Sequence, residues 1–167
     1  MNWDQWFMRL AATVSSKSKD NSTRVGAVIA DQAHRVRTLG FNGFPQGVCD
    51  DIVAYVKRYP TAKIEYVIET MAARHERPGK YLWNEHAERN AIYSAARVGT
   101  AIGGCIIYIN GLPPCTDCAR AIIQSGIVEV AYLDVEIPER WKSNLDEARN
   151  MLLEANVVMR PIYKELQ

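Results

Sequence analysis

The stretch His86-Ala87-Glu88, followed downstream by Pro114-Cys115-Thr116-Asp117-Cys118, is the most informative part of this sequence. It supplies the imidazole of His86, the thiols of Cys115 and Cys118 and the carboxylate of Glu88. Three protein ligands leave the fourth position of a tetrahedral zinc ion open, which distinguishes a catalytic zinc site from a structural one. We therefore expect His86, Cys115 and Cys118 to bind one catalytic Zn²⁺.

Each half of this stretch begins a predicted helix. Apolar residues on one face predict a helix over 86–98, and a second helix is predicted over 115–125. Apolar runs at 105–109 and 127–133 predict buried strands around the second helix, and a capping box at Ser143 and Asp146 predicts a helix over 143–155 before a strand at 157–160. Strands that alternate with helices in this way predict a parallel half-sheet with right-handed crossovers.

The N-terminal part completes the expected fold. Apolar side chains at helical spacing predict a helix over 3–16, and residues 25–30 and 35–41 are predicted to form a hairpin. The pattern loosens over 43–84, an insertion or lid in which two helices are expected. The first is capped at Asp50-Asp51 and runs through Tyr59, and the second starts near Ile64 and ends before Pro78. The sequence therefore predicts an α/β fold with three layers, α/β/α, around a mixed sheet of about five strands.

Glu88 is expected to handle protons rather than bind the metal. It lies two residues after His86, which is about 200° around an α-helix, so both side chains are not expected to reach the same ion. A carboxylate that lies near a metal-activated water, but outside the ligand set, is placed for general acid–base catalysis. We predict that Glu88 is the catalytic residue.

Composition limits the class of protein. The chain has 167 residues, 48% hydrophobic and 23% charged, which suffices for one domain with a buried core. The net charge of +1 gives no general attraction to nucleic acid, so no such partner is expected. No run approaches the ~20 apolar residues that cross a bilayer, and residues 1–6 lack the start of a secretory signal. Four cysteines, two of them in a Cys-x-x-Cys pair, are typical of a reducing compartment. We expect a cytoplasmic protein without a membrane partner.

The cysteines also fit alternative roles. A Cys-x-x-Cys pair at the start of a βα unit describes a thioredoxin-like dithiol as well, although His86 and Glu88 then have no role. A structural zinc would need a fourth ligand, for which Cys49, Cys105 and His75 are the candidates. Cys105 begins an apolar strand and is predicted to pack as a small hydrophobic residue. Cys49 and His75 fall in the insertion, where a second metal site is a further alternative.

The sequence resembles the deoxycytidylate (dCMP) deaminases of the zinc-dependent, cytidine deaminase-like superfamily. The matching segments are residues 18–28, 40–47, 86–92 and 114–127, and His-x-Glu with Pro-Cys-x-x-Cys is the signature of zinc deaminases. The resemblance implies a single zinc-dependent deaminase domain over 1–167 with the cytidine deaminase-like fold and an insertion or lid at 43–84. It also implies a hydrolase acting on the C–N bond of a cyclic amidine, which converts dCMP to dUMP and ammonia for dTMP supply.

The resemblance also implies substrate contacts. Asn42 would contact the deoxyribose, and the backbone amide of Ala87 the pyrimidine carbonyl. An Asn-Gly pair is equally typical of a turn, so both roles stay open for Asn42. We also predict that Pro114, directly before the first cysteine expected to bind zinc, contacts the substrate.

A monophosphate needs cationic or hydroxyl donors, and Ser22, Arg24 and Lys19 lie together before the first strand of the hairpin, so we nominate them. All three could equally be solvated loop residues. Tyr132 and Trp141 are candidates for stacking on the base.

Relatives in this family commonly form hexamers, so a homo-oligomer is expected. Members regulated by nucleotides often have Gly-Tyr-Asn-Gly where this chain has Gly40-Phe41-Asn42-Gly43, which puts an effector nucleotide with Mg²⁺ in question. The competing functions are deamination of another free or modified cytosine nucleotide or nucleoside, and deamination of a base in tRNA or single-stranded DNA.

Overall fold

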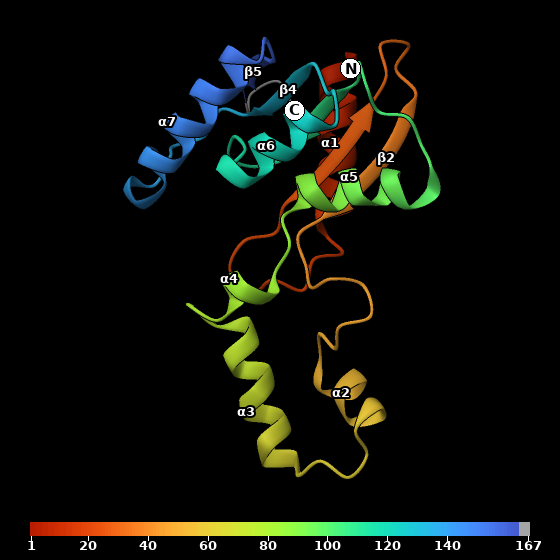
Figure 1. Ribbon diagram of the computed structural model, residues 1–167, viewed down its shortest axis with the longest axis vertical. Coiled ribbons are helices and arrows are strands. Elements are labelled where there is room, and N and C mark those ends of the chain that lie inside the picture. The colour runs from red at the N-terminus through yellow and green to blue at the C-terminus, as the bar shows by residue number, and fades with distance from the viewer. Residues whose placement is uncertain (164–167) are drawn as a thin grey trace.

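A mixed five-stranded sheet lies between the helices of the larger part of the protein, its body (Figure 1). The structure is a computed structural model that describes residues 1–163. The sheet order is β2-β1-β3-β4-β5; β1 runs antiparallel to β2 and β3, whereas β3, β4 and β5 are parallel. The strand bounds are β1 Gly26–Ala30, β2 Val36–Phe41, β3 Ile106–Ile109, β4 Glu129–Leu133 and β5 Val158–Ile162. The expected hairpin and parallel half-sheet are confirmed.

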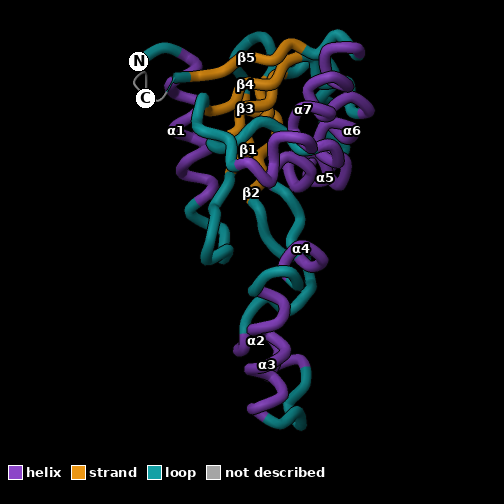
Figure 2. The backbone as a smooth tube through the Cα atoms, turned by 90° about the vertical axis from the view of Figure 1, so that its left-hand side faces the viewer, coloured by secondary structure: helices purple, strands orange, loops and turns teal. Residues whose placement is uncertain are grey.

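Helices cover both faces of the sheet, as Figure 2 shows. On one face lies α1 (Trp3–Ser15), whose Phe7, Met8 and Ala11 form one core with inward side chains of the strands. On the other face lie α5 (Ala87–Val98), α6 (Thr116–Gln124) and α7 (Glu139–Glu154), which enclose a second and larger core. This arrangement confirms the expected three layers.

Small residues bring α5 close to the sheet. Ala87, Ala91 and Ala95 form its buried face. A Cβ atom added to Gly40 of β2 would lie 2.4 Å from the backbone nitrogen of Ala91, so only glycine permits this approach. The close packing fixes where the first turn of α5 lies, and that turn carries the residues of the candidate site.

The segment between β2 and α5 forms an arm that projects from the body of the protein (Figures 1 and 2). It contains α2 (Ile52–Arg58), α3 (Ile64–His75) and α4 (Lys80–Trp83), and the chain enters and leaves it through an antiparallel bridge between Gly43 and Glu85. Tyr55, Val67 and Met71 give the arm a small core of its own. Asp51 caps α2 by accepting a hydrogen bond from the Ala54 N–H at 2.7 Å.

One local prediction was wrong, and one short helix was not predicted. The predicted start of the last helix at Ser143 is wrong, because α7 begins at Glu139 after Pro138, with an acidic residue in its first turn. The short helix α4 was not predicted, since four residues are too few for a periodic pattern. None of the helices described within residues 1–163 has both the length and the apolar character needed to cross a membrane.

Candidate active site

Two helix N-termini meet at the candidate active site. His86 is the N-cap residue of α5 and Cys115 that of α6, and neither side chain caps its own helix. The first backbone N–H group of α6 is satisfied instead by Asn144 of α7, whose Oδ1 accepts from Thr116 at 3.1 Å. The imidazole and the thiol are therefore free to point into the space between the helices.

The three predicted ligands converge. Nδ1 of His86 lies 3.4 Å from Sγ of Cys115 and 3.4 Å from Sγ of Cys118, and all three ligand atoms lie within 4.8 Å of one another. Ligands of a tetrahedral zinc ion, at about 2.1 Å for nitrogen and 2.3 Å for sulfur, are separated by about 3.5 Å. The residues therefore fit a zinc ion, with one position left for a water or a substrate.

Protonation within this cluster agrees with a cation site. The hydrogen bond to Cys118 lowers the pKa of Cys115 to about 4, while the same contact, together with burial, raises the pKa of Cys118. The hydrogen bond to Cys115 raises the pKa of His86 to about 9. The three groups thus share protons in one small space, and a divalent ion would displace those protons.

The other cysteines and His75 lie elsewhere. Cys105 is 3% exposed and lies in the larger core, between the sheet and α5, α6 and α7 (the main core), as predicted. Cys49 and His75 lie in the arm, where Cys49 donates to the carbonyl of Ala54 and His75 pairs with the carbonyl of Asp50. Within residues 1–163, the cluster of His86, Cys115 and Cys118 is the group of three that can hold a metal ion.

Glu88 lies in the first turn of α5 and is 6% exposed. Burial raises the pKa of its carboxyl, against the opposing charge of His86. It lines the same cavity as His86 and Cys115 but is outside the group of ligand atoms. A buried carboxyl with a raised pKa beside a cation site can both accept and return a proton.

The cavity over this site has a volume of about 430 Å³. Of the residues predicted to bind substrate, it is lined by Asn42, Ala87 and Arg24. Trp141 also lines it, whereas Tyr132 packs against the main core. The remaining side chains at its wall include several that were not predicted: Asp20, Arg77, Lys80, Tyr81, Asn84 and Arg140.

The other predicted substrate contacts have different surroundings. Lys19 lines a neighbouring groove, where its Nζ pairs with Asp50 at 3.0 Å and Asp51 at 2.7 Å. The Ser22 hydroxyl donates to Asp20 at 2.9 Å. Pro114 is buried beside Cys115.

Asn42 organises the wall of the cavity. Its Oδ1 accepts from the Val25 N–H at 2.8 Å, and its Nδ2 donates to the Thr23 carbonyl at 2.9 Å and to Asp20 at 3.4 Å. Both hydrogens of the amide are thus engaged within the protein, and one lone pair of Oδ1 remains. The Asn42 side chain orders the loop before β1 as well as facing the cavity.

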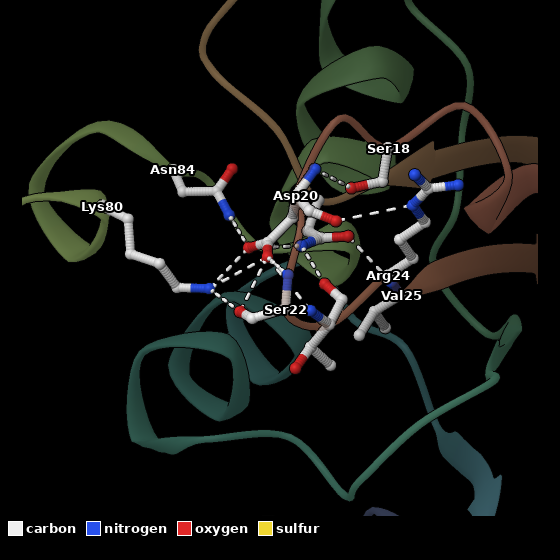
Figure 3. A network of polar contacts seen from close by, with 9 residues as sticks. Ser18, Asp20, Ser22, Arg24, Val25, Lys80 and Asn84 are labelled. Carbon is white, nitrogen blue, oxygen red and sulfur yellow. Dashed lines mark hydrogen bonds and ion pairs between the residues drawn. The ribbon is translucent and has the colours of Figure 1, made fainter. Parts of the chain in front are cut away.

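Asp20 is the centre of a buried polar network, shown in Figure 3. Its carboxylate accepts from Lys80 at 2.7 and 3.0 Å, from Asn84 at 3.0 Å, and from the N–H groups of Ser22 and Thr23 at 2.8 and 3.0 Å. Burial raises the pKa of Asp20, but these hydrogen bonds outweigh it and lower the pKa to about 2. Lys80 and Asn84 come from the arm, so the network joins the base of the arm to the body.

The matched family defines the class of the protein. Residues 1–134 match the model described as the cytidine and deoxycytidylate deaminase zinc-binding region, and the chain therefore belongs to this family. The geometry of His86, Cys115 and Cys118 agrees with the zinc-binding region that gives the family its description.

Individual members of the family with similar sequences are named deaminases or deoxycytidylate deaminases. The chain is 36% identical to an uncharacterized deaminase of Aliivibrio fischeri over 158 residues, covering 93% of this chain and 90% of the relative. It is 35% identical to a probable deoxycytidylate deaminase of Drosophila melanogaster and 32% identical to the human deoxycytidylate deaminase, over 80% of this chain in both cases. The chain spans 60% and 65%, respectively, of the length of these two relatives.

A solved structure shares the fold. The dCMP deaminase from the cyanophage S-TIM5 superposes with a TM-score of 0.66 and 21% identity, over 95% of this chain and 96% of that chain. The cytidine deaminase-like fold expected from the sequence is thereby confirmed.

Proposed function

We propose that this protein hydrolyses dCMP to dUMP and ammonia. The observation that carries the proposal is a cation site of one histidine and two cysteines, beside a buried glutamate, in a cavity that also contains Arg24 and Asn42. The relatives named deoxycytidylate deaminase support the choice of substrate.

Glu88 is the residue that transfers protons in the proposed reaction. When bound, a zinc ion supplies a Lewis acid that lowers the pKa of a water molecule to about 7. Glu88 would take a proton from that water and deliver it to ring nitrogen N3 as the oxygen adds to C4. It would then take the remaining proton from the new C4 hydroxyl and pass it to the amine, so that the C4–N bond breaks, the C4 carbonyl forms and ammonia leaves. Its burial in the first turn of α5 holds the carboxyl beside the reacting atoms and away from bulk water.

The cavity wall accounts for recognition of the nucleotide. We propose that the backbone N–H of Ala87, at the start of α5, donates to the pyrimidine carbonyl, and that the free lone pair of Asn42 Oδ1 accepts from the deoxyribose. Among the nominated phosphate donors, Arg24 lines the cavity and has no carboxylate partner among residues 1–163, so we assign it the phosphate. Lys19, Ser22 and Pro114 stay predictions.

The test is ammonia release by zinc-loaded protein from dCMP, CMP, deoxycytidine, dCTP and adenosine. Turnover confined to dCMP would establish the reaction and the need for a phosphate. Turnover of deoxycytidine as fast as dCMP would remove the role of Arg24, and inactivity towards the whole panel would contradict the proposed function.

A variant separates catalysis from metal binding. Glu88→Gln keeps the size of the side chain but removes the exchangeable carboxyl proton, so activity on dCMP should fall by roughly 10²–10⁴-fold while zinc content is unchanged. Full activity of this variant would show that Glu88 does not transfer the proton in the reaction. Metal analysis of the same sample is the control.

The remaining expectations are also part of the proposal. A homo-oligomer, a hexamer by resemblance, is supported by exposed apolar residues such as Val53 and Tyr66 on the arm, and sedimentation would test it. Cytoplasmic location, one deaminase domain with its insertion at 43–84, and Mg²⁺ with an effector nucleotide stay predictions.

A further inference from the structure

The Asp20 network is the wall between two cavities. Asp20, Lys80 and Asn84 line both the cavity over the metal site and a larger groove of about 1000 Å³ between the arm and the body. Figure 3 shows Lys80 and Asn84 reaching Asp20 from the arm. The contacts that fix the position of Lys80 therefore also affect the shape of the cavity over the metal site.

Lys80 is buried and fully bonded. Its side chain is 10% exposed and that of Asp20 is 7% exposed. All three Nζ hydrogens have acceptors, since Lys80 contacts both oxygens of Asp20 and the hydroxyl of Ser22. The geometry is that of a buried, hydrogen-bonded ion pair, in which removal of one partner leaves the other charge uncompensated.

The neighbours of Lys80 explain why its position matters. Arg77 and Tyr81, three residues before it and one after, line the metal cavity from the arm. The ring of Tyr81 meets that of Trp141 in α7 edge to face, with centroids 6.5 Å apart, so the base of the arm and α7 approach each other at this cavity. The Lys80–Asp20 contact attaches the base of the arm to the body next to these side chains.

The charge of Asp20 gives the pair a second effect. Asp20 lies in the same wall as Arg24, the residue assigned to the phosphate. Without Lys80, a buried carboxylate would face an anionic substrate, and repulsion in a poorly solvated cavity is strong. Lys80 cancels that charge.

A second contact between the arm and the body provides the contrast. Lys19 pairs with Asp50 and Asp51, but its side chain is 51% exposed and the pair does not border the metal cavity. An exposed ion pair of this kind contributes little to stability. A variant of Asp50 therefore loses one ion pair between the arm and the body, while the wall of the metal cavity is unchanged.

We propose that Lys80 is a positioning residue for the deaminase reaction, which holds the base of the arm against the substrate cavity and neutralises Asp20 so that the cavity accepts an anionic nucleotide. The proposal rests on the proposed function, since it requires that the substrate carries a phosphate. Lys80 acts through Asp20, Arg77 and Tyr81 and does not take part in proton transfer.

The experiment compares kcat and KM for dCMP in the zinc-loaded wild type and in Lys80→Met, Lys80→Met combined with Asp20→Asn, and Asp50→Asn. Lys80→Met should raise KM by roughly tenfold or more and change kcat by less than about threefold. The double variant should recover most of the lost affinity, because the uncompensated carboxylate is gone. Asp50→Asn should change neither constant by more than about twofold.

Several outcomes would overturn the role of Lys80. An unchanged KM in Lys80→Met, or a double variant with a KM no better than that of the single variant, would do so. If Lys80→Met does not fold, Lys80→Gln replaces it: the amide keeps a donor but has no charge, so the same rise in KM is expected, and wild-type kinetics would overturn the proposal. A wild-type enzyme that is inactive on dCMP would overturn the proposed function and this inference together, whereas an active wild type with unchanged variants overturns only the inference.

Discussion

The metal-ligand cluster and the Asp20 network are both buried polar groups, yet they are built in opposite ways. The candidate ligands His86, Cys115 and Cys118 lie at the N-termini of two helices packed on the sheet. The network joins a loop of the body to the base of a projecting arm. The first cluster takes its geometry from the rigid core, whereas the second one takes its geometry from its own hydrogen bonds. Damage to the first should therefore abolish chemistry, and damage to the second should change affinity and stability.

The largest expected effect concerns the metal cluster. Cys118→Ser replaces a buried sulfur atom, close to His86 Nδ1, by a hydroxyl that is a poor zinc ligand. Zinc content should fall well below one ion per chain, and deaminase activity should become undetectable. Metal analysis and ammonia release measure both. A variant that keeps its zinc and its activity would show that the third ligand is not Cys118.

An intermediate effect is expected at the wall of the cavity. Arg24→Ala should raise KM for dCMP by roughly ten- to hundredfold, because a charge-assisted contact to the phosphate is lost, with little change in zinc content. Arg58→Ala in the arm is a suitable control, because Arg58 is absent from the residues lining the metal cavity. Equal kinetic constants for the Arg24 variant and the wild type would place the phosphate elsewhere.

The smallest expected effect is the contribution of ionised Asp20 to the free energy of unfolding, which depends on pH. The folded pKa of Asp20, about 2, lies below its usual value of 3.8, so its ionised form stabilises the fold above about pH 4, and this contribution is lost as the pH falls towards 2. Asp20→Asn should be less stable than the wild type near neutral pH by about 2 kcal/mol.

That difference should shrink steadily between about pH 4 and pH 2. Urea unfolding of the zinc-loaded proteins at several pH values measures it. A difference that is constant over this range would mean that Asp20 is not held ionised by Lys80.

Most of the fold, and the grouping of His86, Cys115 and Cys118, could be predicted from the sequence because their signals are local. The spacing of Cys115 and Cys118 lies within one turn of a helix, and the periodicity of α5 is visible in its alanines. The Asp20 network could not be predicted, because Asp20 and Lys80 are 60 residues apart and a single lysine in an irregular segment carries no pattern. The arm could be located only as a stretch where periodicity weakens.

The same reason accounts for the substrate residues. Asn42 could be nominated from the resemblance and Arg24 from the need for a phosphate donor near the hairpin, and both line the cavity. Lys19 was adjacent in sequence but points to the other side of the network, towards Asp50 and Asp51. Neighbouring positions in a loop without regular structure need not share a face, so sequence proximity to Arg24 does not determine where the side chain of Lys19 lies.

The bridge between Gly43 and Glu85 has a consequence for how this chain could be re-engineered. The backbone N–H of Glu85 donates to the Gly43 carbonyl at 2.8 Å and that of Gly43 donates back at 3.0 Å, so the arm departs and returns at one point of the backbone. A short turn spliced across this point would leave every strand connection and the start of α5 in place. A chain shortened in this way would keep His86, Cys115 and Cys118 while losing the side of the cavity that Arg77, Lys80, Tyr81 and Asn84 form.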